Sequence, residues 1–279
     1  MTEVPKFLKN WDKIAVITPS WDPDVDLLYK GIAVLENAGF IVEFMRNDFG
    51  KRGTLAPLSV RVSEVNRAFC KPDFKAVIFS RGGYGAMHLI PYIEYECLQR
   101  YPKWIIGYSD ATALFSAIEK KTGLSYIHGP MVESIGKSTE GTETLIKLLK
   151  GEIPEYSISQ DTPEVKGNLS GGCLSLIVSL LGTPYEMDFK DKVVFLEDVG
   201  EKDYRIDRML TQLKLAGKLD DAKMFIVGGE ENYGVYEDIL GKTGKPYIIG
   251  FPAGHGFRNY PMIMNVMAEI KDGKLRFLI

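Results

Sequence analysis

The first half of the chain alternates short apolar runs with amphipathic stretches. Residues 13–17, which are apolar from Ile14 onward, form a run typical of a buried strand. The apolar positions that follow, from Leu28 to Leu35, recur at helical spacing until Gly39 ends the pattern. The same alternation predicts strands at 40–45, 75–79 and 104–108 and helices at 60–69 and 111–120. Strands that alternate with helices form a mostly parallel sheet covered on both faces, so we predict a flavodoxin-like or Rossmann-like α/β domain.

The pattern changes near the middle of the chain. Between about 133 and 166 apolar positions become sparse around one short helical stretch at 144–150, and we interpret this segment as a linker. Beyond it, the pattern predicts a helix at 174–181, a strand at 193–196, a helix at 204–216, strands at 224–227 and 247–249, and a hairpin of 264–270 with 275–279. We therefore expect an N-terminal domain of residues 1–160, which includes the linker, and a second, smaller α/β domain of residues 161–279.

Composition narrows the classes of function. The 279 residues carry a net charge of −3, which gives no bulk attraction for nucleic acid or an anionic membrane. No apolar run approaches the roughly 20 residues of a membrane span, and we find no export signal. The three cysteines, Cys70, Cys97 and Cys173, show no CxxC spacing, and their odd number argues against a complete disulfide framework. We expect a cytoplasmic protein without nucleic-acid or membrane partners.

Ser109 directly follows the strand predicted at 104–108 and precedes a predicted helix. A strand-turn-helix elbow of this kind lifts a hydroxyl clear of the sheet, near backbone N–H groups that suit a developing oxyanion. The alternative is that Ser109 or Asp110 only caps the helix, an interaction worth about 1 kcal/mol. On these residues alone, both interpretations stay open.

Two adjacent glycines, Gly82 and Gly83, follow the strand at 75–79 in the segment Arg81-Gly82-Gly83-Tyr84-Gly85. Adjacent glycines let a backbone turn with positive φ and bring its N–H groups near an anion or oxyanion. The segment lacks the spacing of a dinucleotide-binding fingerprint. A tight turn without a ligand is the competing interpretation.

Only three histidines occur, so a histidine base must be His88, His128 or His255. His88 lies in an apolar helical stretch and is expected to be packed or at the surface, whereas His128 follows another predicted strand and could line a pocket. His255 lies between two glycines after the strand at 247–249, which would leave its imidazole accessible, although loop histidines often have no role.

A carboxylate could hold such an imidazole in the required tautomer. Glu197 directly follows the strand at 193–196. The next acidic residues, Asp198, Glu201 and Asp203, could instead interact with the dipole of the following helix. No metal-binding motif and no phosphate-binding loop is present in the sequence. Because strand ends of this fold converge, a serine, an acid and a histidine that all follow strands form a joint case for a catalytic site.

Taken in order, these motifs resemble the LD-carboxypeptidase family, which also contains the microcin C self-immunity peptidases. The resemblance covers nearly the whole chain and is carried by eight segments: 81–85, 107–110, 128–131, 171–174, 181–184, 195–198, 205–210 and 254–255. It implies a serine peptidase without a cofactor or metal, in which Ser109 is the nucleophile, Glu197 the orienting acid and His255 the general base. The backbone N–H groups of Gly83 and Asp110 would form the oxyanion hole.

The implied reaction is hydrolysis of the amide between an L-configured centre and a terminal D-amino acid, as in the release of D-alanine from murein tetrapeptides during cell-wall recycling. The candidates for substrate binding are Arg81, Gly82, Tyr84 and His128. Members of the family are often dimers, so the resemblance implies a homodimer.

Two departures from the family pattern bear on the substrate. The stretch between Val227 and His255 is short compared with several relatives, and no tryptophan lies in the 131–167 region, where one would stack on a nucleotide. The second departure disfavours a microcin C-like substrate, although the same catalytic residues could act on another peptide or acyl-amide conjugate. An alternative of another class is a non-catalytic module that binds a nucleotide or peptide, with Ser109 as a helix cap.

Overall fold

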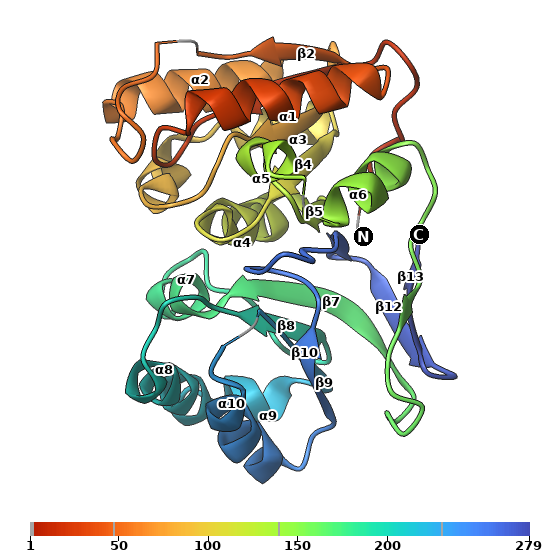
Figure 1. Cartoon of the computed structure of the whole chain (residues 1–279). Coiled ribbons are helices and arrows are strands. Elements are labelled where there is room, and N and C mark those ends of the chain that lie inside the picture. The colour runs from red at the N-terminus through yellow and green to blue at the C-terminus, as the bar shows by residue number, and fades with distance from the viewer. Residues whose placement is uncertain (1–2, 47, 139, 230) are drawn as a thin grey trace.

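The computed structural model describes residues 3–46, 48–138, 140–229 and 231–279 and shows two lobes, each built on its own sheet (Figure 1). The first lobe contains the residues up to α6, and the second contains most of the remaining chain. The two lobes meet where α4 and β11 pack against β7 and α4 also packs against α7. This arrangement confirms the predicted architecture of two α/β units.

The first sheet has the strand order β11-β5-β4-β3-β1-β2. Its strands are β1 (Lys13–Ile17), β2 (Ile41–Phe44), β3 (Phe74–Phe79), β4 (Trp104–Gly107), β5 (Tyr126–His128) and β11 (Met262–Met264). The first five are mutually parallel, and β11 pairs antiparallel with β5. The order 2-1-3-4-5 is that of the flavodoxin-like fold, in which ligand sites lie beyond the carboxyl ends of the strands.

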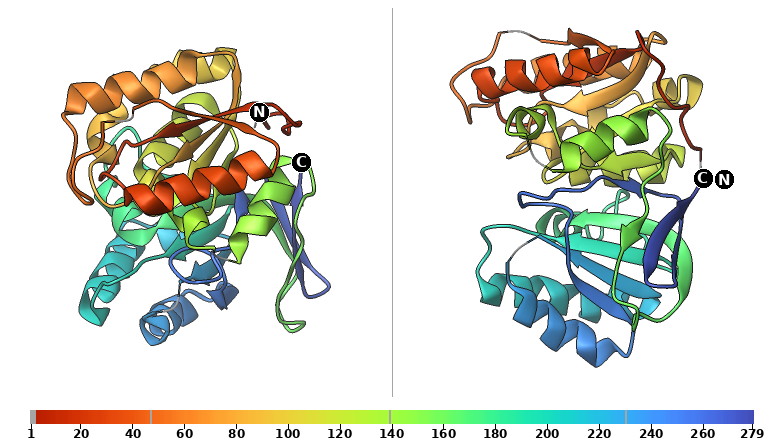
Figure 2. Two further views of the ribbon diagram at one scale, coloured as in Figure 1. Left: turned by 45° about the horizontal axis from the view of Figure 1, so that its top comes forward. Right: turned by 45° about the vertical axis from the view of Figure 1, so that its right-hand side comes forward.

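Helices cover both faces of this sheet (Figure 2). They are α1 (Val25–Asn37), α2 (Leu58–Cys70), η1 (Ala86–Tyr92), α3 (Tyr95–Arg100), α4 (Ala111–Thr122), α5 (Val132–Gly136) and α6 (Gly141–Leu149). α1 packs against α5, while α3 packs between α2 and α4. The buried strands and these helix faces form the larger apolar core.

The second sheet has the order β10-β9-β8-β7-β12-β13-β6. Its strands are β6 (Tyr156–Ser157), β7 (Val165–Cys173), β8 (Val193–Glu197), β9 (Met224–Gly228), β10 (Tyr247–Phe251), β12 (Met267–Lys271) and β13 (Lys274–Leu278). β7 to β10 run parallel, and the strands beyond β7 pair antiparallel. Its helices are α7 (Leu174–Ser179), α8 (Asp203–Leu215), α9 (Lys218–Asp221), α10 (Tyr233–Leu240) and η2 (Gly241–Thr243).

The segment interpreted as a linker contains regular structure. α5 and α6 both lie in it, and α5 packs so closely on α1 that a Cβ on Gly136 would lie 2.0 Å from the carbonyl oxygen of Leu27. A Cβ on Gly31 would similarly lie 2.1 Å from the carbonyl oxygen of Val132. α6 corresponds to the short helical stretch predicted at 144–150, whereas α5, with only five residues, shows too little apolar periodicity to be predicted.

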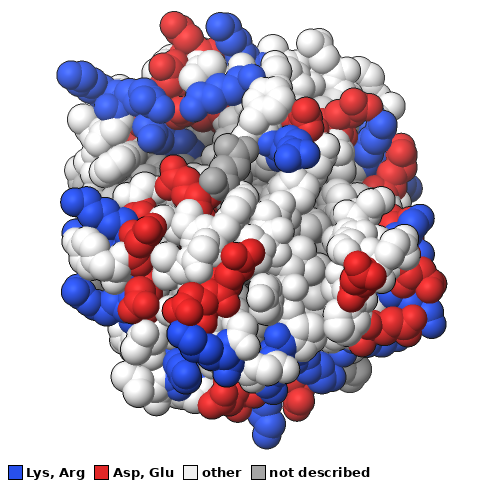
Figure 3. Space-filling model, turned by 60° about the horizontal axis from the view of Figure 1, so that its bottom comes forward, with Lys and Arg blue, Asp and Glu red and all other residues white. Residues whose placement is uncertain are grey.

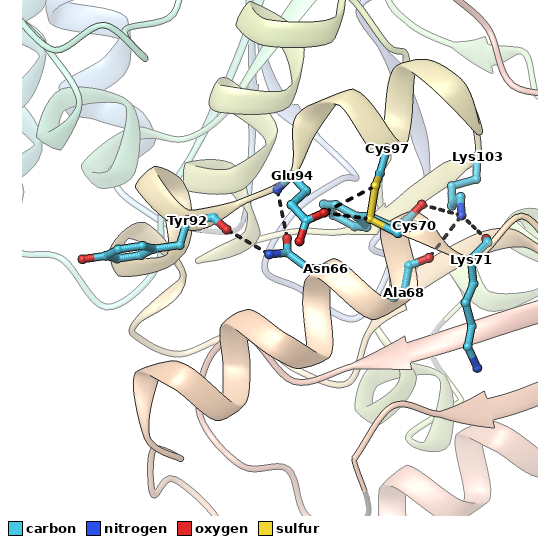
Figure 4. The surroundings of a disulfide bond; sticks show 9 residues. Asn66, Ala68, Cys70, Lys71, Tyr92, Glu94, Cys97 and Lys103 are labelled. Carbon is cyan, nitrogen blue, oxygen red and sulfur yellow. Dashed lines mark hydrogen bonds between the residues drawn. A yellow bond between two sulfur atoms is a disulfide. The ribbon is translucent and has the colours of Figure 1, made fainter.

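Cys70 and Cys97 form a disulfide between the end of α2 and α3, which the scattered cysteine spacing did not predict (Figure 4). The two residues are 27 positions apart and meet because α2 packs against α3. Next to them the buried ammonium of Lys103 donates to the carbonyl oxygens of Ala68, Phe69 and Lys71 and so satisfies the end of α2. Burial lowers the pKa of Lys103 to about 8. Cys173 is free and buried.

On the face shown in Figure 3, Lys and Arg alternate with Asp and Glu around the rim, and uncharged residues occupy the middle. This face therefore offers no single-sign surface of the kind that attracts a polyanion. Within the described ranges, no helix is both long enough and apolar enough to cross a membrane.

Candidate active site

Ser109 lies on a sharp turn between β4 and α4, with a φ of 60°. A positive φ costs a serine energy, and strain of this kind is concentrated at functional sites. The next residue, Asp110, is the N-cap of α4, but its side chain makes no capping hydrogen bond. The helix-cap interpretation of this turn therefore has no support in the geometry.

The Asp110 carboxylate instead anchors the neighbouring loops. Its Oδ2 accepts hydrogen bonds from Ser20 Oγ at 2.6 Å and from the Ala86 backbone N–H at 2.8 Å. Ala86 begins η1 directly after the glycine turn, so this bond fixes the turn against the serine elbow. Burial raises the pKa of Asp110, although these two hydrogen bonds act against that rise.

The glycine turn packs directly on Ser109. A Cβ on Gly82 would lie 3.0 Å from Ser109 Cβ and 3.1 Å from its Oγ, while Gly83 has a φ of 118°. A Cβ on Gly83 would lie 2.6 Å from the ring of Trp21, which covers the turn. The backbone of this turn is thus held close to the serine hydroxyl.

Glu197 and His255 form a close pair in the second lobe. Glu197 ends β8 and is fully buried, and His255 lies in the loop between β10 and β11. Oε2 of Glu197 lies 2.6 Å from Nδ1 of His255 and also accepts the His255 backbone N–H at 3.1 Å. A Cβ on Gly254 would lie 2.7 Å from Glu197 Cγ, so glycine is required for this approach. Nδ1 is engaged by the acid, which leaves Nε2 as the free face of the ring.

The pair shifts the pKa of both groups. Burial alone would raise the pKa of Glu197, but the charge and hydrogen bonds of His255 outweigh it and lower the pKa. Burial alone would lower the pKa of His255, but Glu197 outweighs it and raises the pKa. A raised pKa makes the ring a stronger base that stays protonated to higher pH.

Ser109 and His255 line one cavity of about 150 Å³ at the junction of the lobes. The remaining lining residues are Arg52, Arg81, Gly82, Gly83, Tyr108, Met131, Glu133, Ser134 and Lys137. The cavity brings the elbow of the first lobe and the imidazole of the second to the same space.

One wall of the cavity is rich in positive charge. Arg52 and Lys137 contact Glu133 at 2.8 and 3.4 Å, and Arg81 Nε lies 3.6 Å from the same carboxylate. Three cations surround one anion, so the wall keeps an excess of positive charge. Arg81 was a sequence candidate, but Arg52, Lys137 and Glu133 were not. Arg52 lies in the loop between β2 and α2, away from any strand end, so no local pattern in the sequence indicated it.

Two other sequence candidates lie outside the cavity lining. The Tyr84 side chain is exposed, and its hydroxyl lies 3.4 Å from Nε2 of His88. His128 is fully buried at the end of β5, behind the cavity wall, so a direct contact with substrate is not available to it. The His128 ring packs against the rings of Tyr108 and Phe195 in the interior.

Within the described ranges, one group of possible metal ligands occurs, formed by Cys70, Glu94 and Cys97. Its two sulfur atoms are joined in the disulfide, and it lies on α2, α3 and the turn between η1 and α3 rather than at the cavity (Figure 4).

An elbow serine beside a glycine turn and an imidazole–carboxylate pair at one cavity are typical of hydrolases with a serine nucleophile. Comparison with known proteins extends this result. Residues 14–129 match the model of the LD-carboxypeptidase N-terminal domain, and residues 166–270 match that of the LD-carboxypeptidase C-terminal domain. The chain belongs to the LD-carboxypeptidase family, and it is a peptidase of the carboxypeptidase class.

Three similar proteins indicate the range of this family. A Bacillus subtilis protein named "Probable murein peptide carboxypeptidase" is 34% identical over 275 residues, which cover 90% of this chain and 86% of that one. The crystal structure of a muramoyltetrapeptide carboxypeptidase from Oxalobacter formigenes superposes with a TM-score of 0.83 at 28% identity and covers 94% of this chain and 97% of that one. The Escherichia coli microcin C7 self-immunity protein MccF is 25% identical, with 88% of this chain and 76% of that one covered.

Proposed function

We propose that this protein is a serine-type LD-carboxypeptidase that releases D-alanine from murein tetrapeptides in cell-wall recycling. The observation that carries the proposal is that Ser109 and His255, from different lobes, line one cavity while Glu197 holds the histidine ring. The names of the Bacillus subtilis and Oxalobacter formigenes relatives support the substrate class.

In the proposed mechanism, neutral His255 removes the proton from the Ser109 hydroxyl as its oxygen attacks the amide carbonyl. The negative charge that develops on the carbonyl oxygen would be stabilised by the backbone N–H groups of Gly83 and Asp110. Protonated His255 then donates its proton to the amine of D-alanine, which leaves, and an acyl-enzyme remains. Water, deprotonated by His255, hydrolyses the ester and restores the serine.

A carboxypeptidase must also recognise the free carboxylate of the terminal residue. The cationic wall of Arg52, Arg81 and Lys137 supports this role, because guanidinium groups bind carboxylates through paired hydrogen bonds. The Arg81 guanidinium also lies 5.8 Å from the centroid of the Trp21 ring, which helps to hold it at the cavity.

The test is incubation of the purified protein with murein tri-, tetra- and pentapeptides, with products identified by mass spectrometry. We expect loss of one D-alanine from the tetrapeptide. Ser109→Ala should reduce the rate by about 10⁴-fold or more. The matched control is Ser20→Ala, which removes a buried hydroxyl bonded to Asp110 without removing the nucleophile. Unchanged turnover by Ser109→Ala would disprove the nucleophile assignment.

The likeness to MccF favours one alternative substrate, a microcin C-like acyl-amide conjugate. Against it stands the position of the three tryptophans, Trp11, Trp21 and Trp104, none of which lies in the 131–167 region. An aminoacyl-nucleotide analogue is therefore included in the same assay. Faster release from this analogue than from the tetrapeptide would replace the murein proposal while keeping the catalytic residues.

We also propose a cytoplasmic location and a homodimer, both on the family resemblance. In the cytoplasm a disulfide is rarely retained, so the state of Cys70 and Cys97 is informative. Thiol alkylation in rapidly quenched cells should find both cysteines reduced; a retained disulfide would argue for an oxidising compartment. Light scattering during size-exclusion chromatography measures the assembly.

A further inference from the structure

A second histidine lies behind the catalytic glutamate. The Nε2 atom of His128 is 4.0 Å from Oε1 of Glu197, the carboxylate oxygen that does not contact His255. Both side chains are fully buried. Across the described part of the chain, the two ring nitrogens of His128 have no hydrogen-bond partner. Oε1 of Glu197 likewise accepts no hydrogen bond there. Two unpartnered polar atoms of complementary type thus face each other.

Such a pair is unusual because buried polar atoms are nearly always hydrogen-bonded, and a buried charged oxygen without a donor is costly. A rotation of either side chain that shortens the separation by about 1 Å would bring it into hydrogen-bonding range. The other oxygen of Glu197 already accepts two N–H groups of His255. His128 is thus placed to supply the donor that Oε1 lacks.

The protonation state of His128 decides what it can donate. Burial lowers its pKa to about 4, with Glu197 acting to raise it and His255 to lower it. The ring is therefore neutral near pH 7 and carries one N–H. Because Oε1 of the ionised glutamate is an acceptor, only the tautomer with hydrogen on Nε2 makes a favourable contact.

The surroundings hold the His128 ring in place. His128 lies at the end of β5, where its backbone pairs with Gly107 of β4 and Met262 of β11. The ring of Phe195 packs edge-on at 5.0 Å and that of Tyr108 at 6.1 Å, and the same Tyr108 ring lies 5.0 Å from His255. Aromatic walls and two flanking strands leave His128 little freedom, which suits a residue that fixes the position of another.

We propose that neutral His128 is a positioning residue that donates its Nε2–H to Oε1 of Glu197 and thereby orients the carboxylate that holds His255. The inference rests on the proposed function, because it assigns His128 a role in that same site. The carboxylate is then held from both sides, by His255 on Oε2 and by His128 on Oε1. His128 acts through Glu197 and touches no substrate.

The first test needs no substrate. The chain has only three histidines, so ¹⁵N spectra of the ring nitrogens can be assigned with His88→Gln and His128→Gln. We expect His128 to remain in the neutral Nε2–H form between pH 5 and 9. A His128 ring that titrates near pH 6.5, or that carries its hydrogen on Nδ1, would overturn the proposal whether or not the enzyme acts on murein peptides.

The second test compares His128→Gln with His128→Phe. The amide nitrogen of glutamine reaches about the position of Nε2 and can donate to Glu197, whereas phenylalanine keeps the ring shape without a donor. We expect His128→Phe to lower kcat by about 30-fold or more with KM within about twofold, and His128→Gln to stay within about fivefold of the wild type. Thermal unfolding checks that both variants fold.

Equal kcat values in the two variants, either both near wild type or both strongly reduced, would overturn the positioning role. Failure of the proposed function has a different signature, since the wild-type protein would then release no D-alanine while the ring spectra still report the His128 tautomer.

Discussion

The two lobes contribute to the cavity in different ways. The first lobe supplies backbone shape: the positive φ of Ser109, the glycine turn packed against it and the anchor formed by Asp110. The second lobe supplies charge, in a buried glutamate and a histidine whose pKa values move in opposite directions. Substitutions in the serine elbow and the glycine turn should therefore act through geometry and leave the pH profile in place, whereas substitutions of Glu197 should move it.

The largest expected effect in this comparison comes from Glu197→Gln. In the wild type, the raised pKa of His255 means that the ring becomes neutral, and so able to act as a base, only as pH rises above 6.5. Without the glutamate charge, burial dominates and the pKa of His255 falls, so the acid limb of kcat/KM should move to lower pH. The lost orientation should reduce kcat by about 10³- to 10⁴-fold. Rates measured from pH 5 to 9 test both effects.

Glu201→Gln is the matched control, because Glu201 lies in the same turn but pairs with Arg205 on the surface. It should leave both the rate and the acid limb unchanged. An acid limb that stays in place in Glu197→Gln would show that the second lobe does not set the pH profile, and the comparison would fail.

Gly83→Ala should have a smaller effect of a different kind. The new Cβ would meet the Trp21 ring, and the φ of 118° would strain an alanine, so the turn should shift away from Ser109. Loss of an oxyanion donor costs about 10²- to 10³-fold in kcat. The acid limb should not move. Gly217→Ala is the control, because Gly217 also has positive φ but nothing lies within 4 Å of its Cβ position.

The smallest expected effect on activity comes from Cys70→Ser. The disulfide joins two points of the first lobe on either side of β3, the glycine turn and η1, and does not touch the cavity. The disulfide closes a loop of 27 residues, and its removal should lower the free energy of unfolding by about 3 to 4 kcal/mol, because the unfolded chain gains entropy. The change in kcat should be less than about twofold. Urea unfolding measures the loss, and wild-type protein kept in a reductant should match the variant.

The strands of both lobes were largely predictable, because parallel strands are buried on both faces and appear as continuous apolar runs. β1 matches its predicted bounds, and β8 and β9 differ by one residue. β7 was missed because glycines and polar residues interrupt its apolar pattern. α5 was missed because its five residues are too few to show a recurring apolar pattern, although Val132 and Ile135 are buried in the core.

At the site, the sequence indicated Ser109, Glu197 and His255 because each follows a strand, and convergence of strand ends is a general property of the fold. It did not indicate the cationic partners Arg52 and Lys137, because their meeting depends on loop paths that no local pattern encodes. It also suggested a pocket role for His128, since a sequence position at a strand end does not reveal whether the side chain faces solvent or the interior. The disulfide of Cys70 and Cys97 was not predicted either, because it depends on the packing of α2 against α3.

β11 has a consequence for dissecting the molecule. It follows the His255 loop in the chain but hydrogen-bonds to β5 at the edge of the opposite sheet. A fragment that ends near residue 160 would lose this strand and leave the edge of β5 unpaired. Exposed, unpaired edge strands promote aggregation. The first half, expressed on its own, should therefore be insoluble unless the segment that contains β11 is fused to it.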